Sequence, residues 1–204
     1  MLPYNQKFLV FDTETEGLNL HSSRAWQLSW LICQGDRVLE SNDRYIAHKD
    51  LQMSPVVQKL TGFDWKEYNF RKQPLEKVWN DFKKDLFSPE YLVVGQNLLG
   101  FDTYMIAGIQ RSLGEKPNFE YLNRIYDTVA LGKAYREELD KPKGDFLSWQ
   151  YKVMHDRSLK AKVSQLQLLK FFGIDFDENK LHNALYDNEM CYKVFSALRK
   201  EMNL

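Results

Sequence analysis

Four acidic residues and one histidine lie in three separate segments of the chain, with types and spacing suited to phosphodiester chemistry. In the first segment, Asp12 and Glu14 close an apolar run that begins at Phe8. Alternate side chains of a strand share a face, so the two carboxylates project on the same side. Like charges at the end of a buried strand need a cation, and oxygen ligands without Cys or His favour Mg²⁺ or Mn²⁺ over Zn²⁺. This segment predicts half of a metal site.

The other two segments supply two more carboxylates and a base. Asp102 follows the expected strand 91–94 and opens a helix, and Asp187 lies in the last expected helix, five residues after His182. Four carboxylates can hold two divalent ions about 4 Å apart for in-line attack of water on a phosphodiester. The ordinary pKa of histidine, about 6.5, suits a general base. Five positions turn about 140° round a helix, so we place His182 in the loop before the helix.

Alternating strands and helices must position these residues. Short connections join the first three strands, which are therefore antiparallel, and the later strands alternate with helices, which predicts an α/β domain with a mixed sheet. The chain is expected to form a single domain, residues 1–204. Strands are expected at 7–12, 26–33, 37–46, 91–94 and 124–127, and helices at 55–60, 74–86 and 102–113, from 128, at 164–172 and from 184.

Residues 135–162 interrupt this pattern and are expected to form an inserted, exposed basic arm. Lysine and arginine can follow a single strand by phosphate contact, and aromatic rings can stack on its bases. One alternative is that the arm docks to a polymerase or another protein. The other is that it is a solvated face with no partner. The basic and aromatic residues are Lys141, Lys143, Lys152, Arg157, Lys160, Lys162, Phe146, Trp149 and Tyr151.

Composition limits the class of protein. A hydrophobic content of 44% supports a core, and a formal net charge of zero excludes a histone-like coating of nucleic acid but allows a local basic track. Cys33 and Cys191 lie in apolar segments and are expected to be reduced core residues. No apolar run reaches the roughly 18 residues of a membrane span, and the N-terminus lacks a signal-peptide pattern. We therefore expect a cytoplasmic protein with no membrane partner.

Taken in order, the three segments resemble the motifs of the DnaQ-like, DEDDh-type 3′→5′ exonuclease family. The resemblance covers nearly the whole chain. It implies an RNase H-like fold, with a five-stranded mixed sheet flanked by helices, and two-metal removal of 3′-terminal nucleotides as monophosphates. The matching motifs are Asp12-x-Glu14, Asn97-x-x-x-Phe101-Asp102 and His182-x-Ala184-x-x-Asp187.

The resemblance also implies a role for each matching residue. His182 is expected to be the general base, and Leu18 an apolar wedge against the terminal base. Glu16 stands where the family often has Thr, and an extra acid there could weaken phosphate contact or alter the metal site. The expected ligands of two Mg²⁺ or Mn²⁺ ions are Asp12, Glu14, Asp102 and Asp187. The expected substrate contacts are Thr13, Thr15, Glu16, Leu18, Asn97 and Phe101.

The predicted function is a metal-dependent 3′→5′ exonuclease that acts on single-stranded DNA, with a polymerase as a further candidate partner for proofreading. An exoribonuclease resembling RNase T or oligoribonuclease is the alternative, because no residue decides whether a 2′-OH is accepted. The third candidate function is a non-catalytic nucleic-acid-binding or polymerase-binding module on the same fold. This function predicts loss of a metal ligand or of His182, whereas all four acids and His182 are present.

Overall fold

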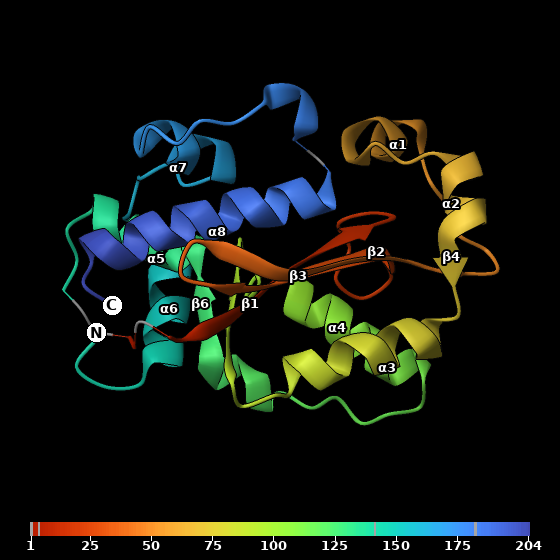
Figure 1. The fold of residues 1–204 in the computed structure, drawn as a ribbon, viewed down its shortest axis with the longest axis horizontal. Coiled ribbons are helices and arrows are strands. Elements are labelled where there is room, and N and C mark those ends of the chain that lie inside the picture. Colours follow the sequence, from red (N-terminus) through yellow and green to blue (C-terminus); the bar gives the residue numbers. More distant parts are fainter. Residues whose placement is uncertain (1, 4, 141, 182) are drawn as a thin grey trace.

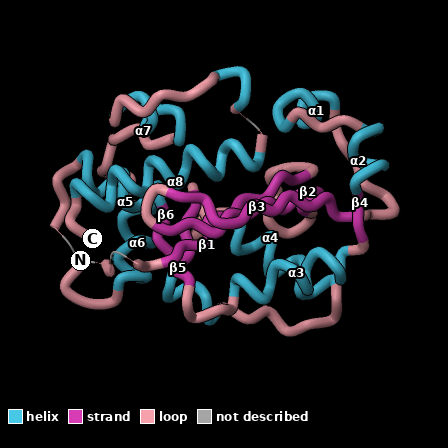
Figure 2. Tube along the Cα trace, viewed as in Figure 1, coloured by secondary structure: helices cyan, strands magenta, loops and turns pink. Residues whose placement is uncertain are grey.

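Strands run through the middle of the protein, with helices above and below them (Figures 1 and 2). The computed structural model describes residues 2–3, 5–140, 142–181 and 183–204. The sheet order is β4-β3-β2-β1-β5-β6, so the predicted α/β fold is confirmed, with six strands in place of five. The strands are β1 (Lys7–Thr15), β2 (Ala25–Gln34), β3 (Arg37–Ile46), β4 (Lys72–Gln73), β5 (Tyr91–Gly95) and β6 (Ile125–Asp127).

The central strand β1 is longer than predicted. It pairs antiparallel with β2 and parallel with β5, and the pairing with β2 continues past Asp12 through Glu14, which lies opposite Gln27. The register shifts only between Glu14 and Thr15. Neighbouring strands therefore supply the backbone hydrogen bonds that keep the polar end of β1 extended. Both carboxylates of the first motif stand on a strand and not in a turn.

The sixth strand was not predicted because it is two residues long. Lys72 and Gln73 pair parallel with Tyr45 and Ile46 of β3, at the edge of the sheet. Two residues are too few to show the alternation by which a strand is recognised in a sequence. The short helix α2 (Trp65–Arg71), just before it, was also not predicted.

Helices cover both faces of the sheet. Alternation along β1 sends Leu9 and Phe11 toward α3 and α4, and Phe8 and Val10 toward α5, α7 and α8. In Figure 1, α8 crosses one face, and α3 and α4 lie on the other. The α-helices are α1 (Pro55–Thr61), α2 (Trp65–Arg71), α3 (Leu75–Leu86), α4 (Asp102–Ser112), α5 (Thr128–Arg136), α6 (Phe146–His155), α7 (Gln165–Phe171) and α8 (Ala184–Glu201), with 3₁₀ turns η1 (Glu120–Arg124) and η2 (Glu178–Lys180).

The inserted arm forms a helix that packs against the rest of the domain. The ring of Phe146 lies 4.8 Å from that of Tyr126 and 5.7 Å from that of Trp149. Buried Gln150 accepts a hydrogen bond from the Asp127 N–H and donates one to the Ile125 carbonyl. The expectation of exposed aromatic side chains was wrong, because these rings complete the core over β6. The basic side chains 143, 152, 157, 160 and 162 are exposed, as predicted.

Two simpler expectations agree with the structure. Cys33 and Cys191 are free and buried. Among the described helices, none has the length and apolarity needed to cross a membrane.

Candidate active site

The first two acids of the site come from the end of β1. Asp12 and Glu14 are partly buried on one face of the strand, while Thr13 between them points to the other face and is 6% exposed. The alternation of a strand thus delivers two carboxylates to one side, as the sequence predicts. The side chains of Asp12 and Glu14 line the same groove.

The third acid is held in place by the residue between the first two. Asp102 begins α4 and is 3% exposed. One of its carboxylate oxygens accepts hydrogen bonds from the Thr13 N–H at 3.0 Å and the Thr13 hydroxyl at 2.6 Å. Charge-assisted bonds of this kind are short and strong. The first and second motifs are therefore joined directly, although 89 positions separate them.

The fourth acid, Asp187, lies in the first turn of α8, which the Asn183 side chain caps by accepting from the Tyr186 N–H. The next residue, Asn188, is 1% exposed and donates to the Ser29 carbonyl at 3.1 Å and hydroxyl at 2.8 Å. Ser29 pairs with Asp12 across the β1–β2 ladder. Asn188 therefore sets the start of α8 beside the first motif. Sequence reasoning missed this residue, because an asparagine inside a helix shows no partner until the fold is known.

The end of β1 and the start of α8 form the floor of a groove of about 750 Å³, which Asp12, Glu14 and Asp187 line and Asp102 does not. Helix α1 supplies one apolar wall and the start of α7 another, and in Figure 1 both helices lie on the α8 side of the sheet. Leu18, at 84% exposed, and Phe101 also line it. The remaining lining residues are Asp12, Thr13, Glu14, Thr15, Gly17, Val56, Val57, Leu60, Thr61, Gln96, Ser164, Gln165, Leu166, Leu181 and Asp187.

The acids of this site raise one another's pKa values. Burial, reinforced by Asp102, Glu14 and Asp187, raises the pKa of Asp12 well above its usual range. Burial, followed by Asp187 and Asp102, raises the pKa of Glu14 to about 8. Burial raises the pKa of Asp102 to about 7, although the Thr13 hydrogen bonds act to lower it. Mutual repulsion among these groups shows that the four acids share one electrostatic site.

This donor set fits hard divalent cations. All four groups are carboxylates, the ligands that Mg²⁺ and Mn²⁺ prefer, and a cation would remove the repulsion that raises their pKa values. Among the described residues, no three Asp, Glu, His or Cys side chains already stand in a metal-coordinating arrangement. Like-charge repulsion accounts for carboxylates that share a pocket without a preformed coordination shell.

The proposed base lies outside the described residues. His182 precedes the cap of α8 in the sequence. Its role as a general base therefore stays a prediction from the motif.

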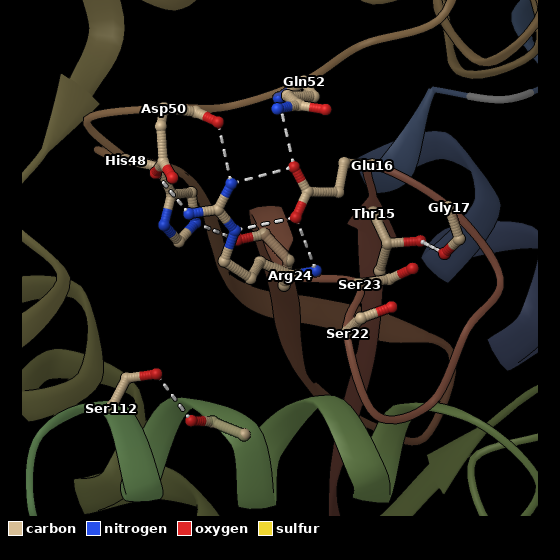
Figure 3. Close-up of polar contacts among 12 residues, drawn as sticks. Thr15, Glu16, Gly17, Ser22, Ser23, Arg24, His48, Asp50, Gln52 and Ser112 are labelled. Atoms are coloured by element: carbon tan, nitrogen blue, oxygen red, sulfur yellow. Dashed lines mark hydrogen bonds and ion pairs between the residues drawn. The ribbon is translucent and has the colours of Figure 1, made fainter.

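Two of the predicted substrate contacts do not line the groove. Glu16 is turned toward Arg24, whose Nε and Nη2 donate to its two oxygens at 2.7 and 3.0 Å (Figure 3). Asn97 is exposed, with a φ of 63°, and forms the turn that precedes Asp102. Glu16 therefore stabilises the loop after β1, and the idea that it alters the metal site finds no contact to support it.

A further buried carboxylate shapes the second motif. Asp127 is fully buried, and it caps α5 by accepting from the Val129 N–H at 2.9 Å, as predicted. It also accepts from the Asn97 and Leu99 N–H groups, both at 3.0 Å. Burial raises its pKa to about 6, against the lowering effect of these bonds. The helix cap therefore also fixes the turn that leads into Asp102.

Comparison with known families and structures agrees with this geometry. The profile of a family described as exonuclease and named for RNase T matches residues 9–195. A search of curated proteins found no match.

Solved structures of exonuclease I have the same fold. The zinc-bound complex of the Escherichia coli enzyme with single-stranded DNA is 17% identical, with a TM-score of 0.75 over 98% of this chain and 41% of that one. A product-bound exonuclease I is 17% identical, with a TM-score of 0.73 over 98% and 44%. An ExoI/SSB-Ct complex is 16% identical, with a TM-score of 0.70 over 97% and 42%. The chain thus spans about two fifths of the length of these proteins.

Proposed function

Because this chain belongs to the exonuclease family, as its DnaQ-like motifs predict, we propose that it removes nucleotides as monophosphates from the 3′ end of single-stranded DNA. One observation carries the proposal. Carboxylates from the end of β1 and the start of α8 line one groove, and together with Asp102 at the start of α4 they form a single electrostatic site. Acids that raise one another's pKa in this way are a common feature of catalytic sites.

The groove suits the end of an unpaired strand. Its walls are largely apolar, with Val56 and Leu60 of α1 at 75% and 55% exposed, and Leu18 and Phe101 beside the acids. Apolar and aromatic side chains can cover a base without reading its sequence. We assign Leu18 and Phe101 to the 3′-terminal nucleotide, with Thr13 and Thr15 at the floor.

We assign two Mg²⁺ or Mn²⁺ ions to Asp12, Glu14, Asp102 and Asp187. Such cations, when bound, offset the charge of the phosphodiester and stabilise the charge that develops during its hydrolysis. The residues of the chain supply orientation: Thr13 holds Asp102 through its N–H and hydroxyl. His182 is assigned to accept the proton of the attacking water at a ring nitrogen.

The test is incubation of a 5′-labelled single-stranded oligodeoxynucleotide with the protein and Mg²⁺. We expect a ladder of products shortened from the 3′ end, and no ladder with Asp12→Ala or in EDTA. A ladder that persists in Asp12→Ala would overturn the proposal. An RNA strand of the same sequence belongs in the same experiment, and faster hydrolysis of RNA would favour an exoribonuclease.

The assignment of a single-stranded partner is supported by exonuclease I, which has been solved with single-stranded DNA. Proofreading would further require a polymerase. A mispaired primer–template tests this role, since a proofreading partner should accelerate removal of the mispaired nucleotide when polymerase is added. We also propose a cytoplasmic location, which cell fractionation can test.

A further inference from the structure

A second, smaller cavity of about 180 Å³ lies between the loop after β1 and helix α4. Its lining combines cationic, imidazole and hydroxyl side chains, and no carboxylate is among the described residues that line it. The polar lining residues used below are Ser22, Arg24, Tyr104 and Arg111.

Two arginines line the cavity, and one of them is already paired with carboxylates. Arg24 lines the cavity, whereas its two carboxylate partners, Glu16 and Asp50, do not. Its Nη1 donates to Asp50 at 2.6 Å, and Figure 3 shows the guanidinium held between the two acids above α4. Arg111 is exposed on α4 and makes no ion pair with any described residue. A guanidinium with no ionic partner in the described part of the chain, in a cavity that the Ser22 side chain also lines, is suited to a phosphate.

The cavity continues the line of the active-site groove. Leu18 and Phe101 line the groove, and the same two segments supply Leu20 and Tyr104 to the cavity. Tyr104 is one helical turn after Phe101 and is 43% exposed. Arg111 lies about 15 Å further along the helix than Phe101, at 1.5 Å per residue. That length matches the rise of about four stacked nucleotides.

We propose that this cavity binds a backbone phosphate of the substrate strand, upstream of the scissile phosphate and within about four nucleotides of the 3′ end. The inference rests on the proposed function. Arg111 and the Ser22 hydroxyl donate to the phosphate, and Tyr104 offers a ring to a base between the two sites. Leu18 separates the cleaved nucleotide from the strand that is held here.

Substrate length tests the site, because dT2 has only the scissile phosphate and dT8 has upstream phosphates. The experiment measures dTMP release from dT2, dT4 and dT8 by wild type, Arg111→Ala and Arg37→Ala. Arg37 is an exposed arginine at the opposite end of the sheet and is the matched control. We expect Arg111→Ala to lower kcat/KM on dT8 about tenfold through KM, with dT2 unchanged, and Arg111→Lys to restore part of the loss.

Equal losses on dT2 and dT8, or no loss on dT8, would overturn the inference. Binding of 5′-fluorescein-dT8 in EDTA, followed by anisotropy against salt, gives a readout independent of hydrolysis. Loss of one phosphate contact should reduce the slope of log K against log salt by about 0.7. If wild type released no dTMP, the proposed function would fail, yet weaker binding by Arg111→Ala than by Arg37→Ala would still support the site. Equal binding by the two variants would exclude it.

Discussion

Two glutamates separated by a single residue have opposite electrostatic surroundings. Burial, together with Asp187 and Asp102, raises the pKa of Glu14 to about 8. Glu16 is also partly buried, but the Arg24 guanidinium and the Gln52 N–H, which donates at 3.1 Å, lower its pKa overall. Glu14 lies near the end of β1, and Glu16 is the first residue after it.

The difference distinguishes Glu16, whose charge stabilises the loop after β1, from Glu14, whose carboxylate belongs to the proposed catalytic site. Arg24 donates to Glu16 and to Asp50, so the charge of Glu16 has a cationic partner within the chain. At Glu14 the neighbouring charges that shift the pKa are all carboxylates. A group of acids without a cation from the protein is destabilising unless an external cation binds. The predictions below exploit this contrast, from the largest effect to the smallest.

Asp12→Asn should reduce hydrolysis by at least about 1,000-fold, because it removes a charged metal ligand without changing side-chain size. In EDTA at pH 8 its melting temperature should equal or exceed that of wild type, since one like charge is gone. Rates on a labelled strand and thermal unfolding check the two parts. A variant that keeps more than a tenth of the wild-type rate would remove Asp12 from the catalytic site.

Glu14→Gln and Glu16→Gln should change stability in opposite directions. Glu16→Gln takes an ionic partner from Arg24, and hydrogen bonds to charged groups contribute about 1.5–3 kcal/mol each, so we expect it to lower the free energy of unfolding by about 1–3 kcal/mol. Glu14→Gln should leave it unchanged or raise it by relieving repulsion. Urea unfolding in EDTA at pH 8 measures both variants. Changes of the same sign would show that the two acids do not differ as described.

The melting temperature of the metal-free protein should fall by about 5 °C between pH 5 and pH 9. The folded pKa values of Glu14 and Asp102, about 8 and about 7, lie above their usual values of 4.5 and 3.8. The folded state therefore holds extra protons, and this stabilisation, complete at low pH, is lost as pH rises through the folded values.

Saturating Mg²⁺ should flatten that pH dependence, because a cation stabilises the ionised acids. Scanning fluorimetry in EDTA and in Mg²⁺ across this pH range makes the comparison, and Glu16→Gln is the control that should keep the slope. A metal-free protein that became more stable as pH rose would contradict the electrostatic description of the groove.

Leu18→Ala should have the smallest effect. The side chain is 84% exposed, so the melting temperature should stay within about 1 °C of wild type. If Leu18 packs against the terminal base, KM for a short oligonucleotide should rise about two- to fivefold, by loss of part of one apolar contact. Steady-state rates on dT4 and thermal unfolding test this. A large fall in stability would instead assign Leu18 to the loop structure.

Local rules allowed much of the fold and site to be predicted. The period of two in β1 placed Asp12 and Glu14 on one face, and the helix expected at 164–172 matches α7, which a Ser164 capping box begins. The start of α5 at residue 128 was also predicted, because a helix start depends on neighbours in the chain. Short elements such as β4 were missed because they show no period.

Long-range contacts could not be predicted from the sequence in the same way. The rings of Phe146 and Trp149 gave the inserted arm the composition of an exposed binding surface, and only their packing on β6 shows that they are core residues. Asn188 likewise has a role only because α8 lies across β2 and brings its amide to Ser29. Neither contact leaves a periodic trace in the sequence.

The sequence by itself determined which acids belong to the motifs, since spacing along a strand or helix decides which side chains share a face. It could not decide which acid is neutralised. Glu14 and Glu16 have the same side chain and nearly the same position, but the Arg24 guanidinium and the Gln52 N–H reach only Glu16, from other parts of the fold. The tertiary structure made that choice, because charge compensation depends on distance in space and not along the chain.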